Sequence, residues 1–392
     1  MQSGSKHRDR IRVGFILQLS ADWFGGVNYF RNLLNLIHDN DDLQIEPVLF
    51  LPHKMDEKLL FGYPDVEIVR AGGMDRHTLP WLFNRSVSKL FHKEIYWEYM
   101  VKKYHIDALS HCNNWVGNAK VISWIPDFQH KYLTDFFTVD ELQARDSGFA
   151  EIAKKSDVVI LSSQDAKKDF LKFYPHYAYK AHVYRFVVPV KQMEYDANDL
   201  HRRYGIKGRY YFIPNQFWTH KNHGVVIDAL HYLNENGHKD IKVICSGNTS
   251  DYRNRNYFEN LMQLVNEFDL TEQFMVLGKI PYSDVQALMQ DCHALINPSL
   301  FEGWSTMVEE AKSMGKAIIL SDLSVHKEQN PAGGMYFERN NYHDLADRML
   351  EMWNLDDEYL VKLKEKSAGY LKTRARDAVC DYRNILEAAL KG

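Results

Sequence analysis

Short apolar runs alternate along most of the chain with segments whose apolar residues recur at helical spacing. Ile11–Leu17 is one such run, and Val27, Phe30 and Leu33 then mark the buried face of a helix. Uninterrupted apolar runs are typical of strands buried on both faces, as in parallel sheets covered by helices. The chain has 392 residues, too many for one hydrophobic core. The pattern therefore predicts an α/β fold with parallel sheets in two domains.

A polar segment over residues 191–208 interrupts this alternation, and the apolar run Tyr210–Ile213 restarts it. We therefore predict a Rossmann-like N-terminal domain over residues 1–190 and a second Rossmann-like domain over residues 191–372. No G-x-G-x-x-G follows the first strand, which argues against a dinucleotide-dependent oxidoreductase despite the α/β pattern.

The stretch Asn297–Asp322 carries the most specific functional signal. Thr306 and Glu309 have the spacing of a capping box, so we expect a helix to begin near Thr306. The amides of Ser305 and Thr306 would then be unpaired and would point at the preceding loop. Free amides at the positive end of a helix dipole form a phosphate-binding site.

Two glutamates frame this predicted phosphate site, Glu302 before the helix and Glu310 inside it, with seven residues between them. Glu310 lies a little over one turn past the cap, from where its carboxylate can reach a ribose hydroxyl. The alternative is an ordinary strand–loop–helix unit with two solvated glutamates. The Pro-Ser turn at 298–299, Gly303 and the later Gly315 favour the binding site.

The stretch resembles the donor-sugar site of the family 4 retaining glycosyltransferases, the group 1 enzymes that include glycogen synthases and mannosyltransferases. The resemblance rests on Glu302, Glu310, Ala311, Gly315 and the strand Ala317–Leu320. It implies the GT-B fold, in which two Rossmann-like domains face a central cleft. It also implies retaining transfer of a sugar from a UDP- or GDP-linked donor to a hydroxyl acceptor, in polysaccharide or glycoconjugate synthesis, without cofactor or metal. In that role Glu302 is a catalytic residue that holds sugar hydroxyls, and Glu310 binds the ribose.

The resemblance assigns the donor phosphates to a second loop in the same half of the chain. Lys221 fits the position of a phosphate-binding lysine, whereas Gln216 stands where the family has an arginine. We expect Gln216 to donate hydrogen bonds there, and His220 or His223 to supply part of the missing positive charge.

Glycines mark further donor contacts that the resemblance implies. Gly25 and Gly26 end the first loop, which in the family faces the donor phosphates. Gly247 would permit close packing against the base or ribose, and Ile280 lies at the turn whose backbone contacts the base. Plain turns between strands and helices would explain the same residues. The family also returns its last helix to the first domain, a role that residues 373–392 would take.

Asp127 and His130 are the acid–base candidates on the acceptor side. They follow the predicted strand Val121–Ile125, at the edge where open α/β sheets bind ligands. The resemblance implies a His-Asp pair here, but this chain has Pro126-Asp127 with His130 three residues later. Asp127 would orient an acceptor hydroxyl, or only cap the turn after the proline. His111, at another strand end, is a second candidate.

Composition limits partners and compartment. The net charge of −4 argues against a nucleic-acid partner, which would require a basic excess. The four cysteines are widely spaced without a C-x-x-C, which favours buried free thiols in a reducing compartment. No apolar run reaches the roughly 20 residues of a membrane span, and the N-terminus lacks the apolar core of a signal peptide. We therefore expect a cytoplasmic protein.

Residues 85–105 have the pattern of a basic, aromatic, amphipathic helix, which could rest on an anionic membrane surface. The alternative is a surface helix with solvated lysines. Many enzymes of the resembled family act on lipid-linked acceptors, so a peripheral position at the inner face of the membrane is one expectation. The acceptor itself would be a glycan, a lipid-linked sugar or another hydroxyl compound.

Two other functions fit the same residues. A nucleotide-sugar epimerase would share the fold and the nucleotide site but would need no acceptor. A non-catalytic nucleotide-sugar-binding subunit would bind the donor without turnover, and Gln216 motivates this second alternative.

Overall fold

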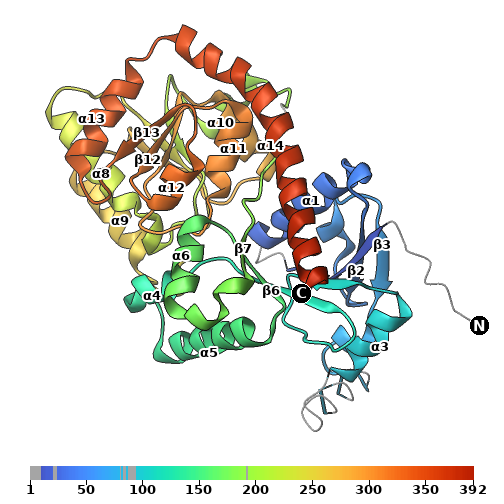
Figure 1. Ribbon diagram of the computed structural model, residues 1–392. Helices are drawn as coiled ribbons and strands as arrows, with labels where there is room; N and C mark the ends of the chain where they lie inside the picture. The colour runs from blue at the N-terminus through green and yellow to red at the C-terminus, as the bar shows by residue number, and fades with distance from the viewer. Residues whose placement is uncertain (1–9, 21–23, 80, 83–84, 87–93, 191–192) are drawn as a thin grey trace, which may run out of the picture. The chain divides into compact units, whose positions relative to one another are not determined.

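The computed structural model describes residues 10–20, 24–79, 81–82, 85–86, 94–190 and 193–392 (Figure 1). The chain forms two compact units. Unit 1 consists of Met1–Phe128, Val139–Val187 and Arg374–Gly392, and unit 2 of Gln129–Thr138 and Val188–Thr373. Each unit contains one parallel sheet with helices packed on it, which confirms the predicted α/β class with two parallel sheets.

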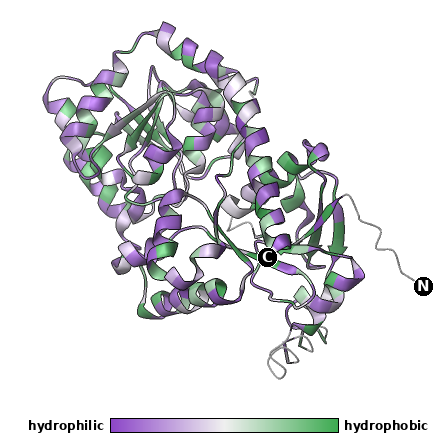
Figure 2. Cartoon of the chain, in the orientation of Figure 1, coloured by the Kyte–Doolittle hydropathy of each residue, from purple (hydrophilic) through white to green (hydrophobic). Residues whose placement is uncertain are grey.

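Unit 1 is built on a seven-stranded parallel sheet of order β3-β2-β1-β4-β5-β6-β7. Successive residues Val48 to Leu51 of β2 are fully buried, so side chains on both faces of this strand are covered. Figure 2 shows the strands as the hydrophobic part of the chain. The strands are β1 (Ile11–Ile16), β2 (Ile45–Leu51), β3 (Glu67–Arg70), β4 (Ala108–Ser110), β5 (Lys120–Ile125), β6 (Val158–Leu161) and β7 (Ala181–Val183).

The first helix of unit 1 differs from its prediction. Gly25 and Gly26 lie in the first turn of α1, which spans Phe24–His38, and not in a loop before it. The buried apolar face that begins at Val27 outweighs the low helix propensity of two glycines at a helix end. Residues 21–23 of the predicted loop lie outside the described residues. Further helices of unit 1 include α3 (Ile95–Lys103), α5 (Val139–Lys155) and α6 (Gln164–Phe173).

Unit 2 has a six-stranded parallel sheet of order β10-β9-β8-β11-β12-β13. The strands are β8 (Tyr211–Ile213), β9 (Val243–Cys245), β10 (Phe274–Val276), β11 (Ala294–Asn297), β12 (Ile318–Ser321) and β13 (Gly334–Phe337). The helices that begin and end in this unit are α4 (Gln129–Tyr132), α7 (Ala197–Tyr204), α8 (His223–Glu235), α9 (Tyr257–Glu267), α10 (Tyr282–Asp291), α11 (Thr306–Met314), α12 (Ser324–Gln329) and α13 (Tyr342–Trp353). The sequence did not lead us to expect β13, because Gly333-Gly334 precedes only a short apolar run.

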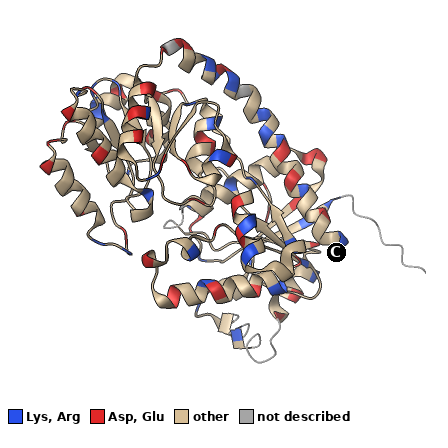
Figure 3. Cartoon of the chain, turned by 60° about the vertical axis from the view of Figure 1, so that its left-hand side comes forward, with Lys and Arg blue, Asp and Glu red and all other residues tan. Residues whose placement is uncertain are grey.

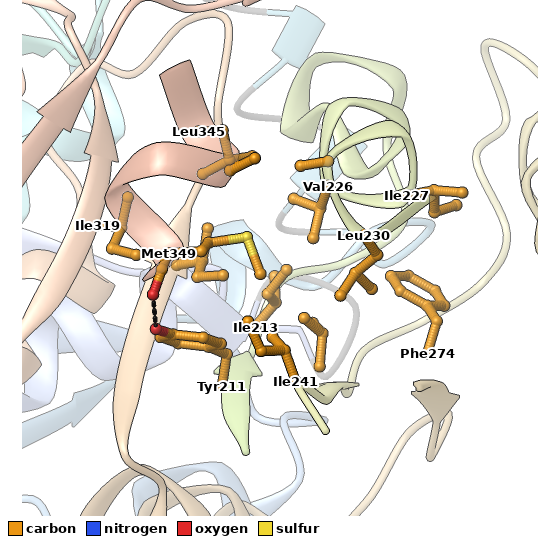
Figure 4. Packing of buried hydrophobic residues seen from close by; sticks show 14 of the residues in the cluster. Tyr211, Ile213, Val226, Ile227, Leu230, Ile241, Phe274, Ile319, Leu345 and Met349 are labelled. Atoms are coloured by element: carbon orange, nitrogen blue, oxygen red, sulfur yellow. Dashed lines mark hydrogen bonds between the residues drawn. The ribbon is translucent and has the colours of Figure 1, made fainter. Parts of the chain in front are cut away.

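The core of unit 2 fixes the positions of the loops that leave the sheet. Tyr211 and Ile213 of β8 point to one face, where they meet Val226, Leu230 and Met349 of α8 and α13 (Figure 4). The Tyr211 hydroxyl donates a hydrogen bond of 2.6 Å to the Met349 carbonyl, so this polar atom is satisfied inside the core. Val225, Val226, Ala229 and Leu230 lie on the buried face of α8.

The last helix, α14, spans Asp357–Lys391 and takes part in both units. Its residues from Arg374 onward belong to unit 1, where Tyr382 donates a 2.8 Å hydrogen bond to the Ser110 hydroxyl. Ala378, Val379 and Ile385 are also buried there. Figure 3 shows both basic and acidic residues along this helix.

Two further predictions are limited by what the structure describes. Within the predicted membrane-surface helix 85–105, the structure describes α3, whereas residues 87–93 lie outside the described residues. Residues 191–192 of the polar segment 191–208 also lie outside them. The four cysteines are free, three of them buried, as the sequence indicated. Among the helices that the structure describes, none combines the length and apolar character needed to cross a membrane.

Candidate functional site

The loop between β11 and α11 forms the centre of the candidate site. The helix begins at Thr306 as predicted, but its N-cap is Ser305, whose Oγ accepts a hydrogen bond from the Val308 amide. The predicted Thr306–Glu309 capping box is therefore wrong by one residue. Glu309 instead lies fully inside the protein, where its carboxylate accepts hydrogen bonds from Gln329 at 3.0 Å and Lys312 at 3.1 Å.

Gln329, at the end of α12, satisfies the Ser305 backbone on both sides. Its side-chain oxygen accepts from the Ser305 amide at 3.2 Å, and its nitrogen donates to the Ser305 carbonyl at 2.9 Å. The Ser305 amide is thus already paired and is not the free phosphate donor that we expected. Thr306 is exposed, and among the described residues no hydrogen-bond acceptor is found for the amides of Thr306 and Met307. The free amide donors therefore begin at Thr306, one residue later than predicted.

Glu302 and Lys221 form an ion pair with 2.6 Å between Oε1 and Nζ. Their side chains are only 11% and 17% exposed, and Ser299 donates a further 2.7 Å hydrogen bond to Glu302. Burial raises the pKa of Glu302, but the charges of Lys221 and His326 and these hydrogen bonds outweigh it and hold that pKa at about 2. The structure thus brings together two residues that the sequence places 81 positions apart.

Glu310 has the opposite electrostatic setting. Its carboxylate accepts a 2.5 Å hydrogen bond from the Tyr282 hydroxyl at the start of α10. Burial without a cationic partner raises the pKa of Glu310 to about 7, and the Tyr282 hydrogen bond lowers it only in part. The sequence missed Tyr282, although its position two residues after the predicted base contact Ile280 was a usable signal.

Gly247 and Ile280 lie on neighbouring loops, because β9 and β10 pair in parallel. The Gly247 amide donates a 2.9 Å hydrogen bond to the Gly278 carbonyl, which ties the two loops together. A Cβ at position 247 would lie 2.4 Å from the Asn215 carbonyl oxygen and 2.8 Å from the Gln216 Cα. In the structure, this glycine therefore admits the backbone of residues 215–216, a closer contact than the sequence indicated.

The two histidines expected to supply charge beside Gln216 do not do so. Burial lowers the pKa of His220 and of His223 to about 3, with Lys221 adding to the effect, so both are neutral near pH 7. His223 stacks on Phe217 at 4.2 Å between ring centroids, as a core residue would. Gln216 itself is exposed, and Lys221 is the cation that the sequence identified in this loop.

A buried polar layer below the loop was not expected from the sequence. Asn297, at the end of β11, donates to the Ser305 hydroxyl at 2.9 Å and accepts from the Ser299 hydroxyl at 2.7 Å. His326 is completely buried, with 2.9 Å between its Nδ1 and the Ser321 carbonyl. These contacts hold the loop of Glu302 from underneath.

The acceptor-side candidates Asp127 and His130 divide between the units, and the glycine pair expected at the donor phosphates lies in unit 1. Asp127, Gly25 and Gly26 belong to unit 1, and His130 belongs to the segment of unit 2 that contains α4. His130 is 1% exposed. The roles of these four residues stay predictions.

His111 is held in unit 1 at the carboxyl end of β4, with a left-handed φ of 57°. Its two ring nitrogens lie 2.7 Å from the Tyr29 hydroxyl and 2.8 Å from the Ser110 hydroxyl. Burial lowers the pKa of His111 to about 3, so its imidazole is neutral. The geometry favours a structural role over the acid–base role considered from the sequence.

Residues 197–369 match the sequence profile of the family described as glycosyl transferases group 1. One curated relative is an N,N'-diacetylbacillosaminyl-diphospho-undecaprenol alpha-1,3-N-acetylgalactosaminyltransferase of Campylobacter jejuni, 33% identical over 120 residues, which are 29% of this chain and 30% of that protein. Another is the O-antigen chain mannosyltransferase RfbU of Salmonella typhimurium, 25% identical over 130 residues, which are 33% of this chain and 34% of that protein. Each match therefore spans about a third of the relative's length.

The fold extends beyond the matched sequence. The crystal structure of Anabaena HepE in complex with UDP and glucose superposes with a TM-score of 0.69 at 16% identity and covers 96% of this chain and 99% of that one. A glycosyltransferase from Rickettsia africae superposes with a TM-score of 0.67 at 17% identity and covers 97% and 99%. These likenesses confirm the predicted fold class, two Rossmann-like domains of the GT-B type.

Proposed function

We propose that the chain, whose residues 197–369 match the glycosyl transferases group 1 profile, transfers a sugar from a nucleotide-diphosphate donor to a hydroxyl acceptor with retention of configuration. The acceptor in this proposal is a glycan or a lipid-linked sugar. The names of the two curated relatives support that part, since one acts on a diphospho-undecaprenol compound and the other on an O-antigen chain.

One observation carries the proposal: the buried Lys221–Glu302 pair stands beside the N-terminus of α11. The Lys221 ammonium lies 2.6 Å from the Glu302 carboxylate, and both side chains have little solvent access. A donor diphosphate needs cationic and amide donors, and a sugar ring needs carboxylate acceptors. Lys221 supplies the cationic donor and Glu302 supplies the carboxylate acceptor, on neighbouring loops.

The chemical problem in this reaction is the departure of a charged diphosphate. We assign Lys221 and the amides of Thr306 and Met307 to stabilise the negative charge that develops on the leaving phosphate. These groups are fixed before the donor binds, so little reorganisation is needed during the reaction. Glu302, ionised above pH about 2, would accept hydrogen bonds from sugar hydroxyls.

We assign Glu310 to the ribose and the turn at Ile280 to the base. The Tyr282 hydroxyl links the two, because Tyr282 follows Ile280 in the chain and donates to the Glu310 carboxylate. We leave the donor as a UDP- or GDP-linked sugar, and assign neither cofactor nor metal. Gly25 and Gly26 remain proposed phosphate contacts, and Asp127 and His130 proposed acceptor contacts.

Product analysis tests the proposal. The full chain is incubated with UDP- and GDP-linked hexoses and N-acetylhexosamines, with and without lipid-linked and glycan acceptors, and the products are separated by mass and by NMR. The proposal predicts a glycoside whose anomeric configuration equals that of the donor, formed only when an acceptor is present. A product with inverted configuration would refute the retaining mechanism.

The same experiment separates the two alternatives. Formation of an epimerised nucleotide sugar without any acceptor would identify an epimerase. A non-catalytic binding subunit, for which the exposed Gln216 is the motive, would bind a donor with normal affinity and turn over none of the acceptors.

A further inference from the structure

Unit 2 also contains a polar hollow, lined by residues other than those assigned to the donor. It has a volume of about 540 Å³ and is lined by Leu133, Leu300, Asp322, Glu338, Arg339 and Asn340. Asp322 follows β12, and residues 338–340 follow β13, so the hollow lies at the carboxyl edge of the sheet. We propose that this hollow binds a pyranose ring of the acceptor, which rests on the transfer function proposed above.

The charged groups of the hollow are only loosely paired with one another. The Arg339 Nε lies 3.5 Å from the Asp322 carboxylate, which also accepts a 3.3 Å hydrogen bond from the Arg339 amide, and the Arg339 Nη1 lies 3.4 Å from the Leu300 carbonyl. Lys327 is farther from Asp322, at 3.9 Å. Hydrogen bonds at these distances are weak, so the carboxylate and the guanidinium keep capacity for a ligand.

This donor and acceptor set matches vicinal sugar hydroxyls. Each hydroxyl both donates and accepts, so a neighbouring pair can donate to Asp322 while it accepts from Arg339. The backbone of the loop is held by other contacts, since the Glu338 amide donates a 2.7 Å hydrogen bond to Asp344. Asn340 adopts a left-handed φ of 91°.

An aromatic surface lies beside the hollow. Tyr132 and Phe301 stack with 6.1 Å between centroids and 26° between planes, and each directly adjoins a residue that lines the hollow, Leu133 and Leu300. Tyr132 remains 49% exposed. An exposed ring next to hydroxyl-binding groups suits the apolar C–H face of a pyranose, whereas it contributes little to the binding of a free phosphate or a metal ion.

The hollow is continuous in sequence with the donor site. Leu300 lines it, Phe301 supports the aromatic surface, and Glu302 pairs with Lys221. A sugar bound there therefore lies next to the loop that we assign to the donor. The sugar of the nucleotide donor carries the same kinds of hydroxyl as an acceptor sugar, so the experiment must distinguish which of these two sugars occupies the hollow.

Ligand binding is measured by saturation-transfer NMR on the full chain, with and without saturating UDP or GDP. The probes are the methyl glycosides of glucose, galactose, mannose and N-acetylglucosamine. We expect at least one glycoside to bind. Arg339→Ala and Tyr132→Ala should each weaken it by at least about tenfold, or about 1.4 kcal/mol. Tyr132→Phe keeps the ring and should bind normally, and so should Arg202→Ala, which removes an arginine with an 80% exposed side chain on α7.

Calorimetric titration with UDP, GDP and the corresponding nucleotide sugars shows whether the hollow binds the acceptor sugar or the sugar of the donor. The proposal expects unchanged affinity for nucleotide and nucleotide sugar in Arg339→Ala and Tyr132→Ala. A loss of affinity for the nucleotide sugar but not for the nucleotide would place the donor's sugar in the hollow and overturn the proposal. It would also be overturned if wild type bound no glycoside, or if neither variant weakened one. Failure of wild type to bind any nucleotide would instead refute the function proposed above, and the glycoside titration without nucleotide would still decide this site.

Discussion

Replacing Lys221 by methionine tests whether the buried ion pair serves stability, donor binding or both. The substitution keeps the length and apolar stem of the side chain but removes the ammonium 2.6 Å from Glu302. Glu302, only 11% exposed, then keeps its charge in a buried position with Ser299 as its remaining close donor. Removal of one partner from a buried pair is costly because the other charge is left uncompensated.

The expected loss of unfolding free energy follows from the pKa of Glu302, which is held at about 2 against an ordinary value of 4.5. At about 1.4 kcal/mol per pKa unit, this difference corresponds to about 3 kcal/mol of stability. Because the folded-state pKa is depressed, that stability is fully present above pH 4.5 and is lost as the pH falls through about 2. In Lys221→Met, burial acts on Glu302 without the charge and hydrogen bond of Lys221, so the pKa of Glu302 rises and most of the stabilisation disappears at neutral pH.

The assay is equilibrium urea unfolding at pH 7 and at pH 4, followed by tryptophan fluorescence, together with calorimetric titration of UDP and GDP at pH 7. We expect Lys221→Met to lose about 3 kcal/mol of unfolding free energy at pH 7 and less at pH 4. Nucleotide affinity should fall by at least about tenfold, since a hydrogen bond to a charged group contributes about 1.5–3 kcal/mol.

The double variant Lys221→Met with Glu302→Gln separates the two effects. A neutral amide removes the buried charge, so most of the lost stability should return, whereas nucleotide affinity should stay low. Recovery of nucleotide affinity in the double variant would refute the assignment of Lys221 to the phosphates. Unchanged stability in Lys221→Met would refute the electrostatic account of the pair.

Three further substitutions test other parts of the site. Glu310→Gln should raise the free energy of unfolding by about 3 kcal/mol above pH 7 and leave it unchanged below pH 4.5. The reason is that the raised folded-state pKa of Glu310 costs stability only where the carboxylate of the unfolded chain is ionised. Urea unfolding at the two pH values measures this change, and calorimetric titration should show at least about tenfold weaker nucleotide binding. Gly247→Ala should weaken nucleotide binding and lower the melting temperature, since its Cβ would collide with the 215–216 backbone, whereas Gly237→Ala, with a φ of 91° and nothing within 4 Å of its Cβ, should affect only the melting temperature. Gln329→Ala should cost about 2 kcal/mol in urea unfolding because it leaves the buried Ser305 amide unpaired, and equal stability would contradict that role.

Most of the described strands were predictable because they are apolar runs buried on both faces. The predicted strand Val121–Ile125 lacks only the first residue of β5, and Ile11–Leu17 was one residue too long. Gly333-Gly334 hid β13, since paired glycines usually mark a turn. The same rule placed Gly25 and Gly26 in a loop, where packing of the helix face on the core decides otherwise.

The donor groups were predictable where local sequence fixes their position. Thr306 starts α11 as expected, because a strand, a turn and a helical pattern follow one another there. The partners of these groups were not predictable, since they come from distant segments. Gln329, Tyr282 and the pairing of Lys221 with Glu302 depend on which strands are neighbours in the sheet, and the sequence does not state that order.

Histidine charge states were the least predictable feature. His220 and His223 flank Lys221 in the sequence, so they looked like additional cations. Their neutrality results from burial against Phe217 and the neighbouring loops, which only the folded structure determines. Exposure, not residue type, decides whether a histidine carries charge near neutral pH.

The central claim is that unit 2 binds the diphosphate of a nucleotide sugar beside Lys221 and α11. Calorimetric titration of the full chain with UDP, uridine, GDP and guanosine tests it most directly. We expect one nucleoside diphosphate to bind at least about 100-fold more tightly than its nucleoside, or about 2.8 kcal/mol, and most of this difference to vanish in Lys221→Met. Equal affinity for nucleoside and diphosphate, or a difference that Lys221→Met leaves intact, would contradict the claim.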